Sequence, residues 1–177
     1  DGAVQVYFEG HHAANGVLRG TKADIWEAGH RVPFLVRWPR KVKPGSASGR
    51  TITHTDFFAT AVSVAGGRIP DAKVAAQDSF DFSPLFLGKD KGWKRAPVIH
   101  HSGGAMFAIR HGDWKLILGN GSGGREKPSG KRFDRPWQLY NLKEDLMEQT
   151  DLYRENPEIA QTLELKALEI MSNGRSR

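Results

Sequence analysis

Lys22 stands in an unusual stretch of sequence, LRGTKADIWEAGHRVP, which covers residues 18–33. Two glycines lie around this lysine, and a Trp-Glu pair follows it. Because glycine has no side chain, the backbone that carries Lys22 can come close to another group. Lys22 could therefore contact a ligand, and the alternative is an exposed lysine in a loop, which is what most lysines are.

Histidines are the other side chains that could contact a ligand. Four of the seven histidines form two adjacent pairs, His11-His12 and His100-His101. Adjacent side chains on a strand point to opposite faces, so at most one of each pair can face a given site. For His100 and His101, two interpretations stay open. Either one imidazole is half-buried and the other exposed, or one of them contacts a ligand.

No self-contained catalytic motif is present. The sequence has no H-E-x-x-H, no P-loop, no G-x-S-x-G and no dinucleotide-binding fingerprint. It also has no cysteine, which excludes disulfides, Cys-ligated zinc and thiol nucleophiles, and leaves the compartment open. The chemistry must therefore come from residues that are dispersed along the chain or lie outside it.

The composition is that of a soluble globular protein, with 38% hydrophobic and 26% charged residues. No window approaches 18 apolar residues, so no membrane span is expected. The first residues have no signal-peptide pattern, and the chain lacks an initiator Met. We therefore expect it to begin in the middle of a longer chain.

A basic surplus favours anionic partners. The formal charge is +6 and the pI is near 9.7, which suits nucleic acid, anionic lipid or acidic glycan without choosing among them. Residues 119–136 hold five of the basic residues on a background rich in Gly, Ser and Pro. This composition predicts a long mobile basic loop, which is either simply solvated or a binding loop.

The first half predicts a strand and a helix. Residues 32–39 form a short apolar run closed by proline, which is typical of a buried strand. From Thr55, a capping pair leads into apolar residues at helical spacing and then a Gly-Gly stop. This predicts a core-facing helix with Phe58, Ala61, Val62 and Ala65 on its buried side.

The second half predicts an antiparallel sheet. Residues 89–94 form a polar break, so we divide the chain into domains at 1–90 and 91–177. Beyond the break, apolar and polar residues alternate on both sides of a His-Gly-Asp turn, and residues 137–142 add a further strand. The tail begins with an Asn-Pro cap and predicts a closing helix with one apolar stripe, Ile159, Leu163, Ala167 and Ile170.

These segments together resemble sulfatases of the alkaline-phosphatase superfamily. The pattern L-R-G-x-K followed by W-E-x-G-x-R-V-P is frequent in the later part of their catalytic domain. Five separated segments resemble such enzymes in the right order, at residues 15–45, 53–70, 78–88, 100–117 and 138–159. The resemblance implies an α/β fold. It would be the C-terminal part of an alkaline-phosphatase-like sulfatase domain, followed by a small α+β subdomain with an antiparallel sheet of about four strands and a closing C-terminal helix.

The resemblance also implies residue roles. Lys22 matches the lysine that reaches the sulfate group, where a fixed ammonium stabilises charge that develops during ester cleavage. Thr21 departs from the commoner glycine, which changes the geometry only mildly. Glu27 and Arg31 match positions that we interpret as structural and paired with each other. His100 and His101 are candidate substrate contacts.

The catalytic centre of such enzymes is largely missing from this sequence. Sulfatases use a formylglycine made from a C/S-x-P-S-R motif, beside a divalent cation, Ca²⁺ or Mg²⁺, held by Asp and Asn residues. Neither the motif nor those ligands are present, and Asp1-Gly2 lies near the place of a ligand tripeptide but lacks its Asn. The chain is thus identified as the C-terminal portion of a sulfuric ester hydrolase that should be inactive alone and bind no metal.

The resemblance implies a sulfated small molecule or sulfated glycan as substrate, and a periplasmic or extracellular location. We expect no nucleic acid or membrane partner, and expect self-association if the first 90 residues lack their neighbouring strands. Two alternatives stay open. One is a phosphomonoester or phosphonate hydrolase on the same scaffold, and the other is a non-catalytic module that binds polyanions or acidic glycans.

Overall fold

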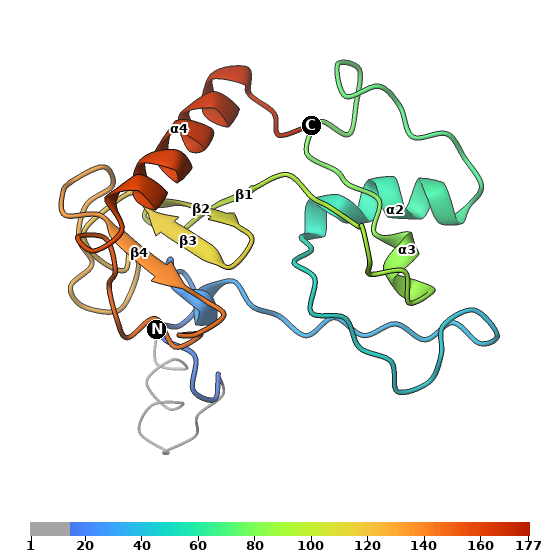
Figure 1. Ribbon diagram of the computed structural model, residues 1–177, viewed down its shortest axis with the longest axis horizontal. Coiled ribbons are helices and arrows are strands. Elements are labelled where there is room, and N and C mark those ends of the chain that lie inside the picture. Colours follow the sequence, from blue (N-terminus) through green and yellow to red (C-terminus); the bar gives the residue numbers. More distant parts are fainter. Residues whose placement is uncertain (1–14) are drawn as a thin grey trace. The chain divides into compact units, whose positions relative to one another are not determined.

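The computed structural model describes residues 15–177 (Figure 1). His11, His12 and the Asp1-Gly2 pair lie outside the described residues. Contacts within the chain define two compact units. Of the described residues, unit 1 contains 15–32 together with Ile99–Leu165, and unit 2 contains Pro33–Val98 together with Lys166–Arg177. The division of the chain at residue 90 stays a prediction.

A four-stranded sheet organises unit 1, and it confirms the predicted antiparallel sheet. The strands follow in sequence order, β1 (Val98–His101), β2 (Phe107–His111), β3 (Trp114–Ile117) and β4 (Gln138–Asn141). The tight turn between β2 and β3 consists of Gly112 and Asp113. Gly112 has φ +61°, the left-handed conformation that the first central residue of a type II′ turn requires.

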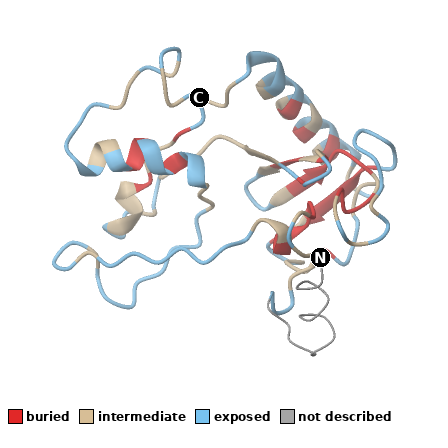
Figure 2. Cartoon of the chain, turned by 180° about the vertical axis from the view of Figure 1, so that it is seen from behind, coloured by how far each residue is buried: buried red, intermediate tan, exposed pale blue. Residues whose placement is uncertain are grey.

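One face of this sheet carries the candidate site. Arg110 lies opposite Lys115, which in turn lies opposite Tyr140, while Ile117 lies between Ala108 and Gln138. Since side chains alternate along a strand, these six residues share one face. The apolar ones join the segment after Lys22 in a buried cluster of Ile25, Trp26, Met106, Ala108, Ile117, Tyr140 and Leu142, against which Leu146 packs. The red strands in Figure 2 mark this core.

The long helix α4 (Pro157–Asn173) confirms the predicted closing helix. Proline occupies its first position, where the missing N–H would have no partner in any case. Three of its residues are buried at helical spacing, Ala160, Leu163 and Ala167, while Leu165 and Leu168 are exposed. Of the predicted stripe, Leu163 and Ala167 are buried, while Ile159 and Ile170 are half-buried, so the prediction is confirmed only in the middle of the helix.

Unit 2 contains the predicted helix as η2 (His54–Asp56) continued by α2 (Phe57–Val64), with the short α3 (Ser83–Phe86) beside it. The predicted buried side of α2 is wrong. Ala59 and Thr60 are buried, whereas Phe58 is 52% exposed. Apolar residues surround much of this helix, so spacing alone could not select the side that faces the interior of unit 2.

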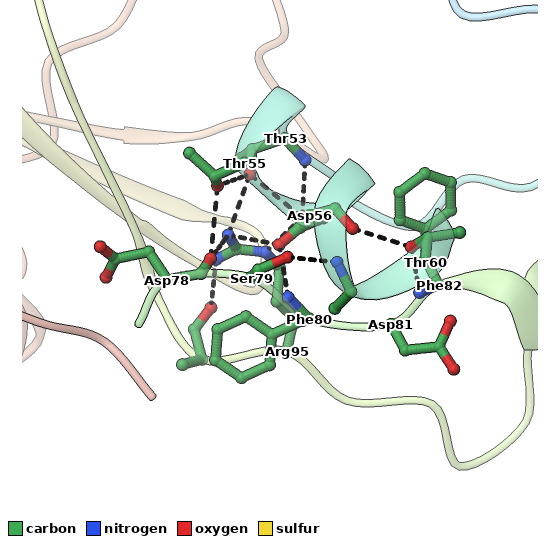
Figure 3. Close-up of polar contacts among 12 residues, drawn as sticks. Thr53, Thr55, Asp56, Thr60, Asp78, Ser79, Phe80, Asp81, Phe82 and Arg95 are labelled. Carbon is green, nitrogen blue, oxygen red and sulfur yellow. Dashed lines mark hydrogen bonds and ion pairs between the residues drawn. The ribbon is translucent and has the colours of Figure 1, made fainter. Parts of the chain in front are cut away.

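Polar contacts determine which side of α2 faces the interior of unit 2. Asp56 is fully buried and pairs with Arg95 through both carboxylate oxygens, at 2.8 and 2.9 Å (Figure 3). The same carboxylate accepts the backbone amides of Thr53 at 2.8 Å and Phe80 at 3.0 Å. Thr60 accepts the amide of Phe82 at 3.0 Å. These bonds fasten the start of the helix to residues 78–82, so the polar residues orient α2.

The predicted buried strand at residues 32–39 is also wrong. These residues have no regular secondary structure, and Leu35 is 92% exposed. A strand forms only where another strand satisfies its amides and carbonyls. Within the described part of the chain, no segment pairs with residues 32–39. No helix in that part is long and apolar enough to cross a membrane.

Candidate functional site

Lys22 lies exposed at the tip of a tight turn. The amide of Asp24 donates to the carbonyl of Thr21 at 3.0 Å, which closes the turn. Ala23 has φ +82°, the value expected for the third residue of a type II turn, although glycine usually occupies that place. No ion pair or hydrogen bond engages the Lys22 side chain within residues 15–177. Its ammonium is available to a ligand.

Gly20 brings this turn close to its own neighbours. It has φ +88°, and a Cβ atom there would lie 3.2 Å from the Cβ of Asp24 and 3.3 Å from that of Trp26. The glycine thus serves close packing inside the turn, where the sequence suggested a backbone that approaches a ligand. A side chain at position 20 would push the residues that carry Lys22 out of place.

Asp24 fastens the turn to the basic loop, and sequence reasoning missed it. The side chain is fully buried. Its Oδ2 accepts the amide of Thr21 at 2.8 Å, and its Oδ1 accepts the amides of Arg125 at 2.6 Å and Glu126 at 3.1 Å. A carboxylate that accepts three amides holds them in one arrangement, since charged hydrogen bonds are stronger than neutral ones.

The basic loop is folded, which corrects the expectation of a mobile segment. Its first residues, Gly119 and 121–123, are buried. The carbonyl of Ser122 accepts the amide of Ile25 at 2.7 Å, and the amide of Ser122 donates to Pro128 at 2.9 Å. The sequence could not show this because the partners of the loop lie about 100 residues away. The exposed basic side chains occur only from Arg125 onward.

Gln138 joins the turn, the sheet and the loop. Its Oε1 accepts Nε1 of Trp26 at 3.1 Å and the hydroxyl of Tyr140 at 2.9 Å. Its Nε2 donates to the carbonyls of Gly119 at 3.1 Å and Gly121 at 3.0 Å. With both amide atoms engaged twice, Gln138 is fully satisfied in a buried place. No signal in the sequence distinguishes it from an ordinary strand residue.

Arg19, the arginine of the L-R-G pattern, supports the other side of the turn. Its guanidinium stacks 3.6 Å over the ring of Trp26 and donates to the carbonyl of Glu148 at 2.8 Å and the hydroxyl of Tyr140 at 3.1 Å. Arg19 therefore contributes to the position of Lys22 and is not itself free to bind a ligand.

A buried ion network lies beneath the short helix η1 (Glu27–Gly29). Lys115 is fully buried, with its Nζ 3.1 Å from Glu27 and 2.8 Å from Glu148. Glu27 also pairs with Arg31 at 3.0 Å and with Arg110 at 3.4 Å. The predicted pairing of Glu27 with Arg31 is confirmed. Lys115 was missed, although a lysine between Trp114 and Leu116 in a strand of apolar residues was a signal that it needed a partner.

The pKa values of the two carboxyl groups in this network, Glu27 and Glu148, are shifted in opposite directions. Burial alone would raise the pKa of Glu27, but Lys115, Arg110 and Arg31 outweigh it and hold that pKa below its ordinary value. Burial raises the pKa of Glu148, and the attraction of Lys115 offsets this only in part. We therefore regard Glu27 as the firmly ionised partner, since three cations surround it.

His100 and His101 lie in different surroundings. The Nε2 atoms of His100 and His30 are buried without a hydrogen-bond partner in the described residues, and the two rings meet edge to face at 4.3 Å. Burial, reinforced by Lys115, lowers the pKa of His30 to about 4 and that of His100 well below its ordinary value. Both rings are neutral at pH 7. His101 is exposed, and its Nδ1 lies 2.8 Å from the carbonyl of Ser102.

The described residues do not form a metal centre. No group of three or more His, Cys, Asp or Glu side chains that could hold a metal ion occurs between residues 15 and 177. The carboxylates nearest Lys22 in the chain are already engaged, because Asp24 accepts three amides and Glu27 pairs with three cations. What the described residues offer is the exposed ammonium of Lys22, which has no partner among them.

Comparisons with known proteins show which family this chain belongs to. The sequence model of the family described as N-sulphoglucosamine sulphohydrolase, C-terminal, matches residues 21–173. The N-acetylgalactosamine-6-O-sulfatase of Bacteroides thetaiotaomicron is 32% identical over 154 residues, which are 86% of this chain and 29% of the relative. The steryl-sulfatase of Rattus norvegicus is 36% identical over 101 residues, which are 57% of this chain and 17% of the relative.

A solved structure is also similar. It is described in connection with the metabolism of multiple glycosaminoglycans by Bacteroides thetaiotaomicron. It superimposes with a TM-score of 0.77 at 30% sequence identity, and the match covers 96% of this chain and 35% of the other.

The fold and the comparisons define the C-terminal region of a sulfatase, which confirms the resemblance seen in the sequence. The chain belongs to the N-sulphoglucosamine sulphohydrolase C-terminal family. It covers the C-terminal part of the sulfatase domain and spans less than a third of the length of the curated relatives named above.

Proposed function

We propose that the full-length protein hydrolyses sulfate esters and that Lys22 contacts the sulfate group. The observation that carries this proposal is the exposed ammonium of Lys22, without a partner in residues 15–177, on a turn held by Asp24. Because the turn is already held, its backbone needs no reorganisation to present the ammonium to a developing anion. Membership of the sulfatase family supports the choice of sulfate as that anion.

We propose His100 and His101 as further substrate-binding residues with unequal roles. His101 is exposed and is the better placed to meet a substrate directly. His100 is neutral and largely buried, so its influence would pass through the packing of His30 and the segment that follows Lys22.

The nucleophile and the metal would come from residues outside 15–177. We propose a formylglycine, which supplies the attacking oxygen when hydrated, and a divalent cation, Ca²⁺ or Mg²⁺. The described residues contain no group of side chains that could hold this cation. We therefore expect residues 1–177 to be inactive as an isolated chain.

The substrate would be a sulfated glycan or a sulfated small molecule. The named relatives act on an N-acetylgalactosamine 6-O-sulfate and on steryl sulfates. Both match this chain at 32% and 36% identity, so the similarity supports sulfate as the group recognised and does not select between the two kinds of substrate. We also propose a periplasmic or extracellular location, which fractionation of the source cells would test.

A comparison of two model substrates tests the proposed function. We expect the full-length protein to hydrolyse 4-nitrophenyl sulfate with a higher kcat/KM than 4-nitrophenyl phosphate. A strong preference for the phosphate would replace the sulfatase by a phosphatase on the same scaffold. Tight binding of sulfated glycans without turnover of either ester would favour the non-catalytic module.

A further inference from the structure

An open depression adjoins the Lys22 turn within unit 1. It has a volume of about 730 Å³, and Ala23, the neighbour of Lys22, forms part of its wall. Four glycines also line it, Gly103, Gly104, Gly123 and Gly124. A Cβ at Gly104 would lie 2.5 Å from the carbonyl oxygen of Gly123, so this part of the wall is packed backbone. The depression is therefore a formed feature of the fold.

Three basic residues also line the depression. They are Arg125, Lys131 and Arg132, together with a single acid, Asp134. No hydrogen bond or ion pair of these three basic side chains occurs in the part of the chain that the structure describes. Arg135 of the same loop differs from these three residues because it has partners. Its guanidinium lies 3.9 Å from the centre of the Trp137 ring and 3.5 Å from Glu164.

Unpaired cations that share one concave surface repel one another, and a bound anion relieves that repulsion. The lining carries three positive charges against one negative charge. Asp24 fixes this surface relative to Lys22, because its carboxylate binds the backbone amides of both Thr21 and Arg125. A ligand whose first anionic group meets Lys22 could place a second one in the depression.

We propose that the depression binds a second anionic group, sulfate or carboxylate, of an acidic oligosaccharide whose reacting sulfate contacts Lys22. This inference rests on the proposed function and specifies its substrate class. A steryl or aryl sulfate has a single anionic group and leaves the depression without a partner, whereas an oligosaccharide with several anionic groups can satisfy both places. Arg125, Lys131 and Arg132 are then specificity residues for the length and charge of the substrate.

Binding of a heparin hexasaccharide to the full-length protein tests the inference, measured by isothermal titration calorimetry. The triple variant Arg125→Gln, Lys131→Gln, Arg132→Gln should bind about 30-fold more weakly, at roughly threefold for each exposed ion pair. The control is Lys127→Gln, which removes a charge from the same loop at an exposed position outside the depression. It should bind within about twofold of the wild type, the effect of a general loss of charge.

Selectivity gives a second readout. In the triple variant, the ratio of hexasaccharide affinity to kcat/KM for 4-nitrophenyl sulfate should fall by about 30-fold, since the small ester has no second anion. If the triple variant unfolds, Lys131→Gln alone should weaken hexasaccharide binding by about threefold. Absence of binding by the wild type, or equal losses in the triple variant and in Lys127→Gln, would overturn the inference. Failure to hydrolyse any sulfate ester would instead overturn the proposed function.

Discussion

The carboxylate of Asp24 accepts the backbone amide of Arg125 at 2.6 Å, and it accepts that of Thr21, the neighbour of Lys22, at 2.8 Å. One buried side chain thus joins the turn that presents Lys22 to the loop that lines the basic depression. The relative position of the two anion contacts that we propose depends on these hydrogen bonds of Asp24.

Replacement of Asp24 by Ala should destabilise the connection between the Lys22 turn and the basic loop. Three amides lose their charged acceptor, so we expect a loss of about 1.5–3 kcal/mol in the free energy of unfolding. Urea unfolding of the full-length protein measures this loss. Asp113→Ala, at an exposed aspartate in a tight turn, should stay within about 0.5 kcal/mol of the wild type. Equal stability of the two variants would show that the hydrogen bonds of Asp24 contribute little to the free energy of unfolding.

Replacement of the buried Lys115 should destabilise the protein more than replacement of Asp24. Lys115→Met leaves Glu27 and Glu148 without their shared cation in a buried place, so we expect a destabilisation of about 3–5 kcal/mol. The double variant Lys115→Met, Glu148→Gln removes one of the stranded charges and should recover part of that loss. A double variant less stable than Lys115→Met alone would contradict this explanation.

Local patterns explain why much of unit 1 could be predicted. The alternation around Gly112 and the Asn-Pro cap of α4 involve neighbouring residues, and both elements were confirmed. The pairing of Glu27 with Arg31 spans one helical turn and was also predicted. Asp24 and Gln138 were missed because their partners lie about 100 residues away, where no local pattern reports them.

Two of the failed predictions concern unit 2. The apolar run at residues 32–39 has the composition of a strand, but no described segment pairs with it, so composition and structure disagree. The buried side of α2 follows from the bonds of Asp56 and Thr60 to a distant segment, and the spacing of apolar residues did not contain that information.

Two histidines predict how stability depends on pH. The folded pKa of His30, about 4, lies below its ordinary value of 6.5, and the pKa of His100 is shifted in the same direction. The unfolded chain therefore binds more protons below pH 6.5, and stability should fall as the pH falls from about 6.5 toward 4.

His30→Phe tests this dependence because it keeps a ring and removes a titrating group. Urea unfolding at pH 7 and pH 5 should show a smaller difference in the variant than in the wild type. The control is His54→Gln, at an exposed histidine, which should keep the wild-type difference. An unchanged pH dependence in His30→Phe would contradict the assignment.

Exposed apolar side chains predict that residues 1–177 self-associate as an isolated chain. Leu35 is 92% exposed and Phe34 is 46% exposed, next to each other in a run without strand partners. Light scattering should show oligomers that Leu35→Lys reduces. A control change at an exposed polar position, Lys43→Gln, should leave them unchanged. A monomeric wild-type chain would contradict this expectation.

Turnover of 4-nitrophenyl sulfate by the Lys22→Ala variant of the full-length protein is the most direct measurement of the role of Lys22. If its ammonium contacts the sulfate group, kcat/KM should fall by about 100-fold or more, the scale for loss of one donor to the transition state. Urea unfolding should stay near that of the wild type, because the Lys22 side chain has no bond in the described residues. Unchanged kcat/KM in a folded variant would show that Lys22 is only an exposed lysine in a loop.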